Sequence, residues 1–200
     1  MSRGLGDVYK RQTQFIDNTD ELFEKAVEKL KKEGMQALMI DVRSDPGGML
    51  TSVVSICDYL LPEGTIVSIK DKNGKVEEEY KSTDEQSLDM PMVVLTNEYS
   101  ASASEILTSA LKEFKVATVV GTNTYGKGIV QSVIPLGDGT AIKLTTQKYF
   151  THDGNDIHKK GVAPDIEVEL PDDYTYKDFQ GKNDSQYQKG IEVLKEKLGK

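Results

Sequence analysis

Short apolar runs alternate along the chain with longer stretches in which apolar residues recur every three or four positions. Residues 37–42 and 92–96 are two of the runs, and their length and content of β-branched and aliphatic side chains are typical of buried strands. The stretch after Asn18 and the one after Ser104 have the 3.6-residue spacing of amphipathic helices, with Gly34 as the stop signal of the first. Strand and helix therefore alternate, which predicts an α/β fold.

Further elements follow from the same patterns. Strands are expected over residues 64–70, 75–81, 116–120, 129–135 and 140–146, and helices over residues 53–60 and 185–198. Turn residues at 71–74 and 137–139 predict two hairpins. Residues 1–12 are polar and show no periodicity, so we expect them to be poorly ordered, with the first strand beginning at Thr13.

Composition narrows the class of protein. A chain of 200 residues with 37% hydrophobic and 29% charged residues fits one soluble globular domain. The net charge of −8 and the lack of a basic stripe argue against binding to nucleic acid. No apolar run approaches the roughly 18 residues of a membrane helix, and nothing at the start reads as a signal peptide. Cys57 is the one cysteine, which excludes an intrachain disulfide and a cysteine metal cluster.

The first candidate for chemistry is Ser102. It lies in the motif Ser100-Ala101-Ser102-Ala103-Ser104, between the expected strand over residues 92–96 and the helix that follows it. At such a junction a hydroxyl can point into a cleft while the first turn of the helix offers free backbone N–H groups. A serine at this place is also a common helix cap, so position alone does not make it a nucleophile.

The second candidate is Lys127, which stands between Gly126 and Gly128. Two glycine neighbours allow another part of the fold to pack closely around the amine. A lysine accepts a proton only when it is neutral, and burial favours the neutral amine. We therefore expect Lys127 to be packed among apolar atoms, with Gln131, four residues on, hydrogen-bonded to its amine.

Taken together, the sequence motifs around Ser102 and Lys127 resemble those of the carboxyl-terminal processing, or tail-specific, peptidases of the S41 family. The matching words run from Asn97 to Glu105 and from Tyr125 to Gln131, and Ser102, Lys127 and Gln131 also match in their spacing of 25 and then four residues. The resemblance implies a serine endopeptidase with a Ser/Lys catalytic pair, an acyl-enzyme intermediate and no cofactor or metal. It implies an α/β fold of the crotonase and Clp protease kind, with a β-sheet core and flanking helices.

A third motif lies at the end of the strand over residues 37–42; it is Asp41-Val42-Arg43-Ser44-Asp45-Pro46-Gly47-Gly48. Taken alone it is a turn, but it lies at the carboxyl end of a strand, where sites of α/β proteins form. In the resembling family this word and the neighbour of the nucleophile supply the two N–H groups of the oxyanion hole. Here these are Gly47 or Gly48, with Gly48 favoured, and Ala103. We expect Asp41 and Arg43 to hold the loop by a salt bridge.

The resemblance also carries expectations about organisation and partners. Residues 13–200 are expected to form the catalytic domain and residues 1–12 to be foreign to it, while the family's PDZ domain and its export or membrane segment are not recognisable here. The substrates implied are proteins with extended C-terminal tails. The parent protein is expected to be exported or membrane-associated, as family members are; the sequence does not indicate an oligomeric state.

Several alternatives remain. His152 and His158 are the only histidines, so they are the only candidates for a Ser/His site or, with Asp153 and Asp156, for a metal site, although no ligand spacing fits. Residues 121–127 resemble the P-loop motif of nucleotide-binding proteins. However, Gly128 stands where a P-loop has the Ser or Thr that binds magnesium, and a strand is expected to follow where a P-loop needs a helix. A non-catalytic peptide-binding protein on the same fold is the third alternative.

Overall fold

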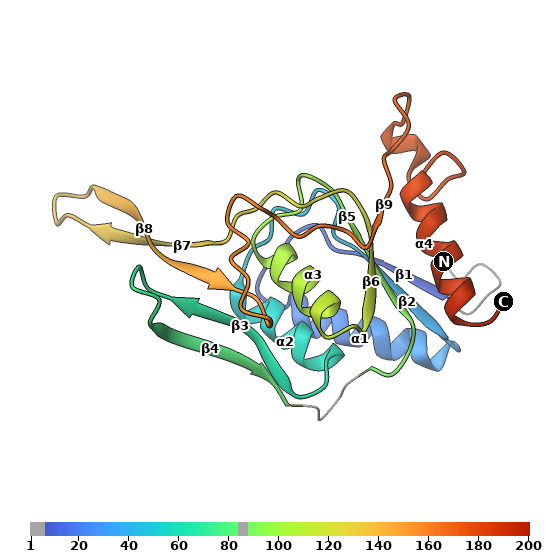
Figure 1. The fold of residues 1–200 in the computed structure, drawn as a ribbon, viewed down its shortest axis with the longest axis horizontal. Coiled ribbons are helices and arrows are strands. Elements are labelled where there is room, and N and C mark those ends of the chain that lie inside the picture. The colour runs from blue at the N-terminus through green and yellow to red at the C-terminus, as the bar shows by residue number, and fades with distance from the viewer. Residues whose placement is uncertain (1–6, 84–87) are drawn as a thin grey trace.

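The chain folds around a parallel β-sheet with helices on both faces (Figure 1). The computed structural model describes residues 7–83 and 88–200. The helices are α1 (Thr19–Lys32), α2 (Leu50–Leu60), α3 (Ala103–Glu113) and α4 (Ser185–Lys197), with a short 3₁₀ helix, η1, at Tyr176–Asp178. The strands of the parallel sheet are β1 (Asp7–Arg11), β2 (Ala37–Asp41), β5 (Met92–Thr96), β6 (Ala117–Gly121) and β9 (Ile166–Glu167), in the order β1-β2-β5-β6-β9.

The two central strands, β2 and β5, are buried along their whole length. They read as continuous apolar runs because helices cover both faces of a parallel sheet. One face packs against α1, α2 and α3 through a large apolar core that includes Phe23, Ile56 and Leu107. All four parallel registers bring the carboxyl ends of the strands to one edge, where the loops that follow β2, β5 and β6 can meet.

The other face of the sheet is covered by α4. Val193 and Leu194 of this helix pack on a small apolar cluster that contains Met39 and Leu95. At Gly190 the helix comes so close to the sheet that an added Cβ would lie 2.6 Å from the Met39 side chain. The last helix is therefore an integral layer of the fold.

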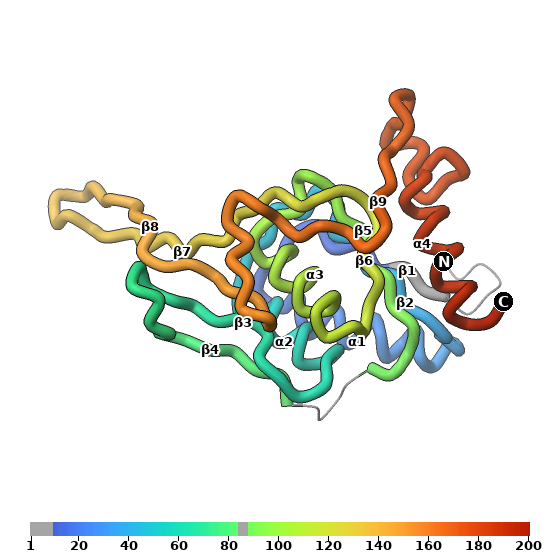
Figure 2. The backbone as a smooth tube through the Cα atoms, in the orientation of Figure 1, coloured from blue at the N-terminus to red at the C-terminus, as the bar shows by residue number. Residues whose placement is uncertain are grey.

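A second sheet of four antiparallel strands lies beside the first (Figures 1 and 2). Its strands are β3 (Gly64–Lys70), β4 (Val76–Ser82), β7 (Ile129–Pro135) and β8 (Ala141–Phe150), in the order β4-β3-β8-β7. The β7–β8 hairpin projects away from the body of the molecule, and most of its side chains are exposed. It begins two residues after Lys127.

Most predicted elements are confirmed, and the beginning of the chain is the main correction. Both hairpin turns form, with Asp71 N–H donating to Lys75 O and Leu136 N–H donating to Thr140 O. Asp7–Arg11, predicted to be poorly ordered, is instead strand β1, and no strand begins at Thr13. An edge strand pairs through its backbone, so its side chains need not be apolar. Residues 1–6 of the segment predicted as poorly ordered lie outside the described residues.

No helix in the described ranges has both the length and the apolar content that crossing a bilayer requires.

Candidate active site

Ser102 occupies the turn between β5 and α3 in an unusual backbone conformation. It precedes the first residue of α3, with φ 58° and ψ −115°, a region that residues with a Cβ rarely adopt. Ser100 anchors the turn to the end of β2, because its Oγ–H donates a hydrogen bond to Val42 O at 2.8 Å. The half-buried Ser102 is thus presented on a sharp, firmly anchored turn at the carboxyl ends of the strands.

The loop that follows β2 lies directly against this turn. A Cβ on Gly47 would stand 2.5 Å from Ala101 O and 2.7 Å from Ala103 N, so only a glycine fits there. Ala101 N–H and Ser104 Oγ–H both donate to the main-chain oxygen of Asp45, each at 3.0 Å. The two loops that the sequence singled out are therefore joined as one rigid surface.

Two backbone N–H groups on this surface have no acceptor among the residues that the structure describes. They belong to Gly48 and Ala103. The Gly47 N–H, by contrast, donates to Asp45 Oδ1 at 2.8 Å. Of the two glycines left open by the sequence, Gly48 is the one with a free donor.

Lys127 lies in the loop between β6 and β7, and this loop is attached to the turn around Ser102. Tyr125 N–H donates to Ser100 O at 3.0 Å, and Lys159 N–H donates to Gly126 O at 2.8 Å from the far side. Gly128 is in close contact with the backbone of His158, where an added Cβ would lie 2.7 Å from His158 N. The glycines beside Lys127 thus allow the residues around 158 to pack closely on this loop.

Glu105 connects the two candidate residues. Its carboxylate is fully buried and accepts four hydrogen bonds. Oε2 accepts from Ser102 N–H at 2.9 Å and from Lys127 N–H at 2.8 Å. Oε1 accepts from Thr124 Oγ–H and from Gly126 N–H, both at 2.6 Å. The motif Ser102-x-x-Glu105 has the form of a capping box, so the sequence could have predicted the bond from Glu105 to the Ser102 N–H. Its bonds to the loop that carries Lys127 are long-range, and no local motif predicts them.

The predicted salt bridge between Asp41 and Arg43 is present, and it is part of a larger buried network. Arg43 bonds the Asp41 carboxylate at 2.7 Å on one side and the carboxylate of Asp184, which precedes α4, at 2.8 Å on the other. Both aspartates are fully buried. These opposite charges hold the pKa of the Arg43 guanidinium above its usual value. The loop after β2 is therefore tied to the helix on the far face of the sheet, by a residue that sequence analysis did not identify.

Two expectations about side chains are not met. Lys127 is exposed and not packed among apolar atoms, and its amine donates no hydrogen bond to any described residue. Gln131 is also exposed, and its side-chain amide points across the hairpin to Thr145 Oγ1, 3.5 Å away. The backbone positions of Ser102 and Lys127 are brought together through Glu105, whereas Gln131 does not contact the lysine amine.

The alternative sites gain no support from the geometry. His152 Nδ1 lies 2.9 Å from Thr65 O and its ring contacts that of Phe114 in a tilted arrangement, while His158 Nδ1 is buried without a hydrogen-bond partner among the described residues. Neither histidine is bonded to Ser102 within the described ranges. In the same ranges no group of three or more His, Cys, Asp or Glu side chains could hold a metal ion. Lys127 is followed by strand β7 and not by a helix, so the P-loop resemblance lacks the helix that would hold phosphate.

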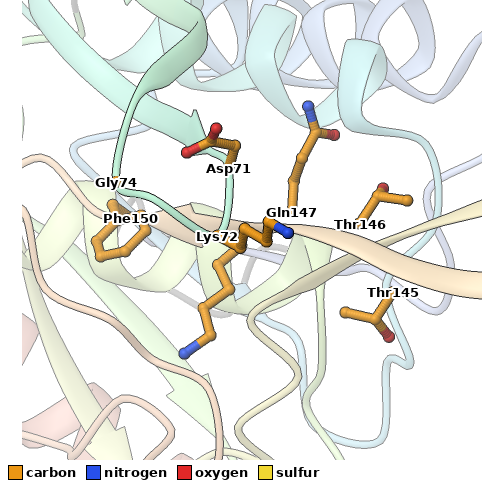
Figure 3. Close-up of a pocket in the computed structure, with 8 residues that line it drawn as sticks. Asp71, Lys72, Gly74, Thr145, Thr146, Gln147 and Phe150 are labelled. Carbon is orange, nitrogen blue, oxygen red and sulfur yellow. The ribbon is translucent and has the colours of Figure 1, made fainter.

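A cavity of about 310 Å³ lies apart from this site, between the β3–β4 turn and β8 (Figure 3). Asp71 and Lys72 line it from the turn, and Thr145, Thr146 and Gln147 line it from β8. None of the candidate residues lines this cavity.

Comparison with known proteins gives one consistent answer. The sequence pattern of peptidase family S41 matches residues 8–168, so the match begins within β1 and not at Thr13. A carboxyl-terminal-processing protease of Synechocystis sp. is 39% identical over 186 residues, which are 93% of this chain and 43% of the relative. The carboxy-terminal processing protease CtpB of Bacillus subtilis is 44% identical over 159 residues, which are 79% of this chain and 33% of the relative.

The solved structure of a photosystem II D1 C-terminal processing protease superposes with a TM-score of 0.81 and 33% identity, covering 94% of this chain and 48% of the other. The expected α/β fold of the crotonase and Clp protease kind is thereby confirmed. The chain spans less than half the length of each of these relatives.

Proposed function

The chain belongs to peptidase family S41, and from this premise we propose that it hydrolyses peptide bonds with Ser102 as nucleophile and Lys127 as general base. The observation that carries the proposal is the shared carboxylate of Glu105. It bonds the backbone N–H of Ser102 and that of Lys127 through one oxygen atom. These two residues lie 25 positions apart and are the ones that the family resemblance assigns to catalysis.

The chemistry is acyl transfer. The neutral amine of Lys127 takes the proton from Ser102 Oγ as the oxygen attacks the peptide carbonyl, and a tetrahedral oxyanion forms. When this intermediate collapses, the C–N bond breaks, the lysine proton passes to the leaving amine and an ester on Ser102 remains. Water then attacks the ester while Lys127 accepts its proton, the bond between the acyl carbon and Ser102 Oγ breaks, and Lys127 returns the proton to Ser102 Oγ as the carboxylic acid product leaves.

The oxyanion is assigned to the N–H groups of Gly48 and Ala103. Both lack an acceptor within the described residues, and they lie on the two loops that Asp45 joins. Preorganised donors of this kind typically contribute about 3 kcal/mol each to the transition state. The Gly47 N–H is already bonded to Asp45, so Gly47 serves the hole by allowing close approach of the loops.

The lysine side chain must turn toward Ser102 for this mechanism. Its rotation about side-chain bonds leaves the backbone bond to Glu105 intact, so the amine can move while the loop stays fixed. A bound substrate excludes water from the site, which favours the neutral amine. By the family resemblance, Gln131 exchanges its bond to Thr145 for one to this amine.

The substrates we propose are proteins cleaved near extended C-terminal tails. Support comes from the relatives, which are named as processing proteases, and from the family resemblance. On the same resemblance we propose a location outside the cytoplasm.

Labelling with a fluorophosphonate tests the nucleophile without any assumption about the substrate. The expected result is one adduct on Ser102, no adduct in Ser102→Ala, and labelling slowed at least tenfold in Lys127→Ala. Lys72→Ala, which removes an exposed lysine from the β3–β4 turn, serves as the matched control and labels normally. Labelling of Ser102→Ala at the same rate as the parent would refute the assignment.

Cleavage of an unfolded protein such as casein by the same four chains tests the activity. Loss of cleavage in both site variants, with normal cleavage by Lys72→Ala, is the expected outcome. A chain that binds casein but neither cleaves it nor reacts with the fluorophosphonate would instead favour the peptide-binding alternative.

A further inference from the structure

Asp45 is a fully buried carboxyl group that the proposed chemistry does not use. Its Oδ1 accepts the Gly47 N–H, whereas its Oδ2 is buried without any hydrogen-bond partner in the described part of the chain. Leaving one oxygen of a buried carboxylate unpaired is costly, and such groups call for an explanation. No ion pair compensates Asp45 among the described residues.

Among the described residues, no charged group on the elements around Asp45 pairs with it. On its own loop, Arg43 is paired with Asp41 and Asp184. On α3, the Glu105 carboxylate accepts four hydrogen bonds, and on the lysine loop the Lys127 amine is exposed. The environment of Asp45 therefore consists of backbone and hydroxyl groups, with the Ser104 side chain as its nearest polar neighbour on the helix.

We propose that Asp45 is the positioning residue of the oxyanion hole, acting on both of its donors at once. Its carboxyl oxygen takes the Gly47 N–H and so fixes the turn in which the neighbouring Gly48 N–H has no acceptor among the described residues. Its main-chain oxygen bonds Ala101 N–H and Ser104 Oγ–H on either side of Ser102 and Ala103, and so fixes the second donor relative to the first. This role rests on the proposed function and adds to it the residue that sets the geometry of the hole.

The same arrangement makes the hole sensitive to protonation. Burial raises the pKa of Asp45 to about 6. A proton has a place ready on the unpartnered Oδ2, and Oδ1 keeps its bond to Gly47. A negative charge on Asp45 opposes the negative charge that forms on the substrate oxygen, and protonation removes this opposition. The oxyanion is therefore more stable when Asp45 is protonated than when Asp45 is ionised.

Two substitutions separate the roles. Asp45→Asn keeps an oxygen for the Gly47 N–H but cannot ionise, whereas Asp45→Ala removes the acceptor. We expect Asp45→Ala to lower kcat at least tenfold with little change in KM, and Asp45→Asn to retain kcat at pH 5.5. As the pH rises from 5.5 to 8, kcat/KM of Asp45→Asn should gain roughly tenfold relative to the parent chain. Ser82→Ala, which removes buried hydrogen bonds far from the site, is the control for general loss of stability.

An unchanged kcat in Asp45→Ala, or parallel pH profiles for the parent chain and Asp45→Asn, would overturn the proposal. A separate readout does not depend on activity. In ¹⁵N NMR spectra the Gly47 amide should shift with a midpoint near pH 6 in the parent chain and not in Asp45→Asn, and its hydrogen exchange should be slower than that of Gly48. Inactivity of the parent chain with a titrating Gly47 amide would count against the proposed function alone. A Gly47 amide that neither titrates nor is protected would count against the role of Asp45.

Discussion

The backbone N–H groups of Ser102 and Lys127 donate to the same atom, Oε2 of Glu105, at 2.9 and 2.8 Å. Because that carboxylate is buried and has four donors, any shift of one loop must break or bend a bond to the other. The separation of the two catalytic candidates is thus set by a third residue.

The first prediction concerns Glu105 itself. In Glu105→Gln one acceptor oxygen is replaced by an NH₂ group, so two of the four donors lose their partner. The free energy of unfolding should fall by about 2–4 kcal/mol and peptidase activity at least tenfold. Urea denaturation and casein cleavage measure the two effects.

Glu113→Gln is the matched control for Glu105→Gln. Glu113 lies on the same helix and accepts hydrogen bonds from residues 151–155, away from the proposed site. Its replacement should lower stability without the loss of kcat. Equal kcat values for Glu105→Gln and the parent chain would show that the shared carboxylate does not set the site.

A second prediction compares two glycines with similar backbone conformations. Gly47 has φ +92° and Gly74 has φ +83°, so alanine is strained at both, by roughly 1 kcal/mol. Only at Gly47 does the added Cβ meet neighbouring atoms, at 2.5 Å and 2.7 Å in the turn around Ser102, whereas Gly74 has none within 4 Å.

Gly47→Ala should therefore cost about 2 kcal/mol more in unfolding free energy than Gly74→Ala and should abolish fluorophosphonate labelling of Ser102. Gly74→Ala should label normally. Normal labelling of a folded Gly47→Ala chain would contradict the close packing of the two loops.

A third prediction concerns stability and pH. The pKa of Asp45 rises from its ordinary 3.8 to about 6 in the folded chain. Between pH 4 and 6 the folded chain then binds more protons at this group than the unfolded chain does, so the stability that depends on Asp45 falls as the pH rises and is lost above pH 6.

The size of this effect is about 3 kcal/mol. Because Asp45→Asn cannot ionise, the unfolding free energy of the parent chain minus that of Asp45→Asn should decrease by most of this amount from pH 4 to pH 7, as measured by urea denaturation at each pH. A difference that is constant with pH would mean that Asp45 has an ordinary pKa.

A fourth prediction concerns the network on the far face of the sheet. Asp184→Ala leaves the buried Arg43 with one carboxylate in place of two and removes the side-chain cap that accepts Tyr187 N–H at the start of α4. The expected loss in unfolding free energy is about 3–5 kcal/mol. The exposed Asp172→Ala should change it by less than about 0.5 kcal/mol. Similar denaturation midpoints for the two variants would show that the Arg43 network contributes little.

The sequence predicted the elements whose signal is local. The apolar run at 92–96, the helical spacing after Ser104 and the Asn-Gly turn at 73–74 each specify their own structure, and each is confirmed. Strand β1 was missed because an edge strand can be polar, and its pairing with β2 depends on residues 30 positions away.

The parts of the site that could not be predicted depend on contacts between distant segments. Asp41 and Arg43 are two residues apart and their bridge was expected, but Asp184 lies 141 residues after Arg43 and no local pattern points to it. The prediction that Lys127 is buried was wrong, because glycine neighbours allow close packing around a side chain but do not require it. Nothing in the sequence distinguishes Asp45 from an ordinary turn residue, because the burial of its unpartnered oxygen depends on the packing of distant segments.

The backbone of Ser102 has a thermodynamic consequence of its own. A non-glycine residue at φ 58° and ψ −115° costs of order 1–3 kcal/mol, and glycine adopts such angles with little strain. Folding alone would thus select glycine at position 102, and a chain with glycine there should unfold at a higher temperature than the natural one. Serine at this position therefore lowers the stability of the fold, and this supports the proposal that its hydroxyl has a use in the site.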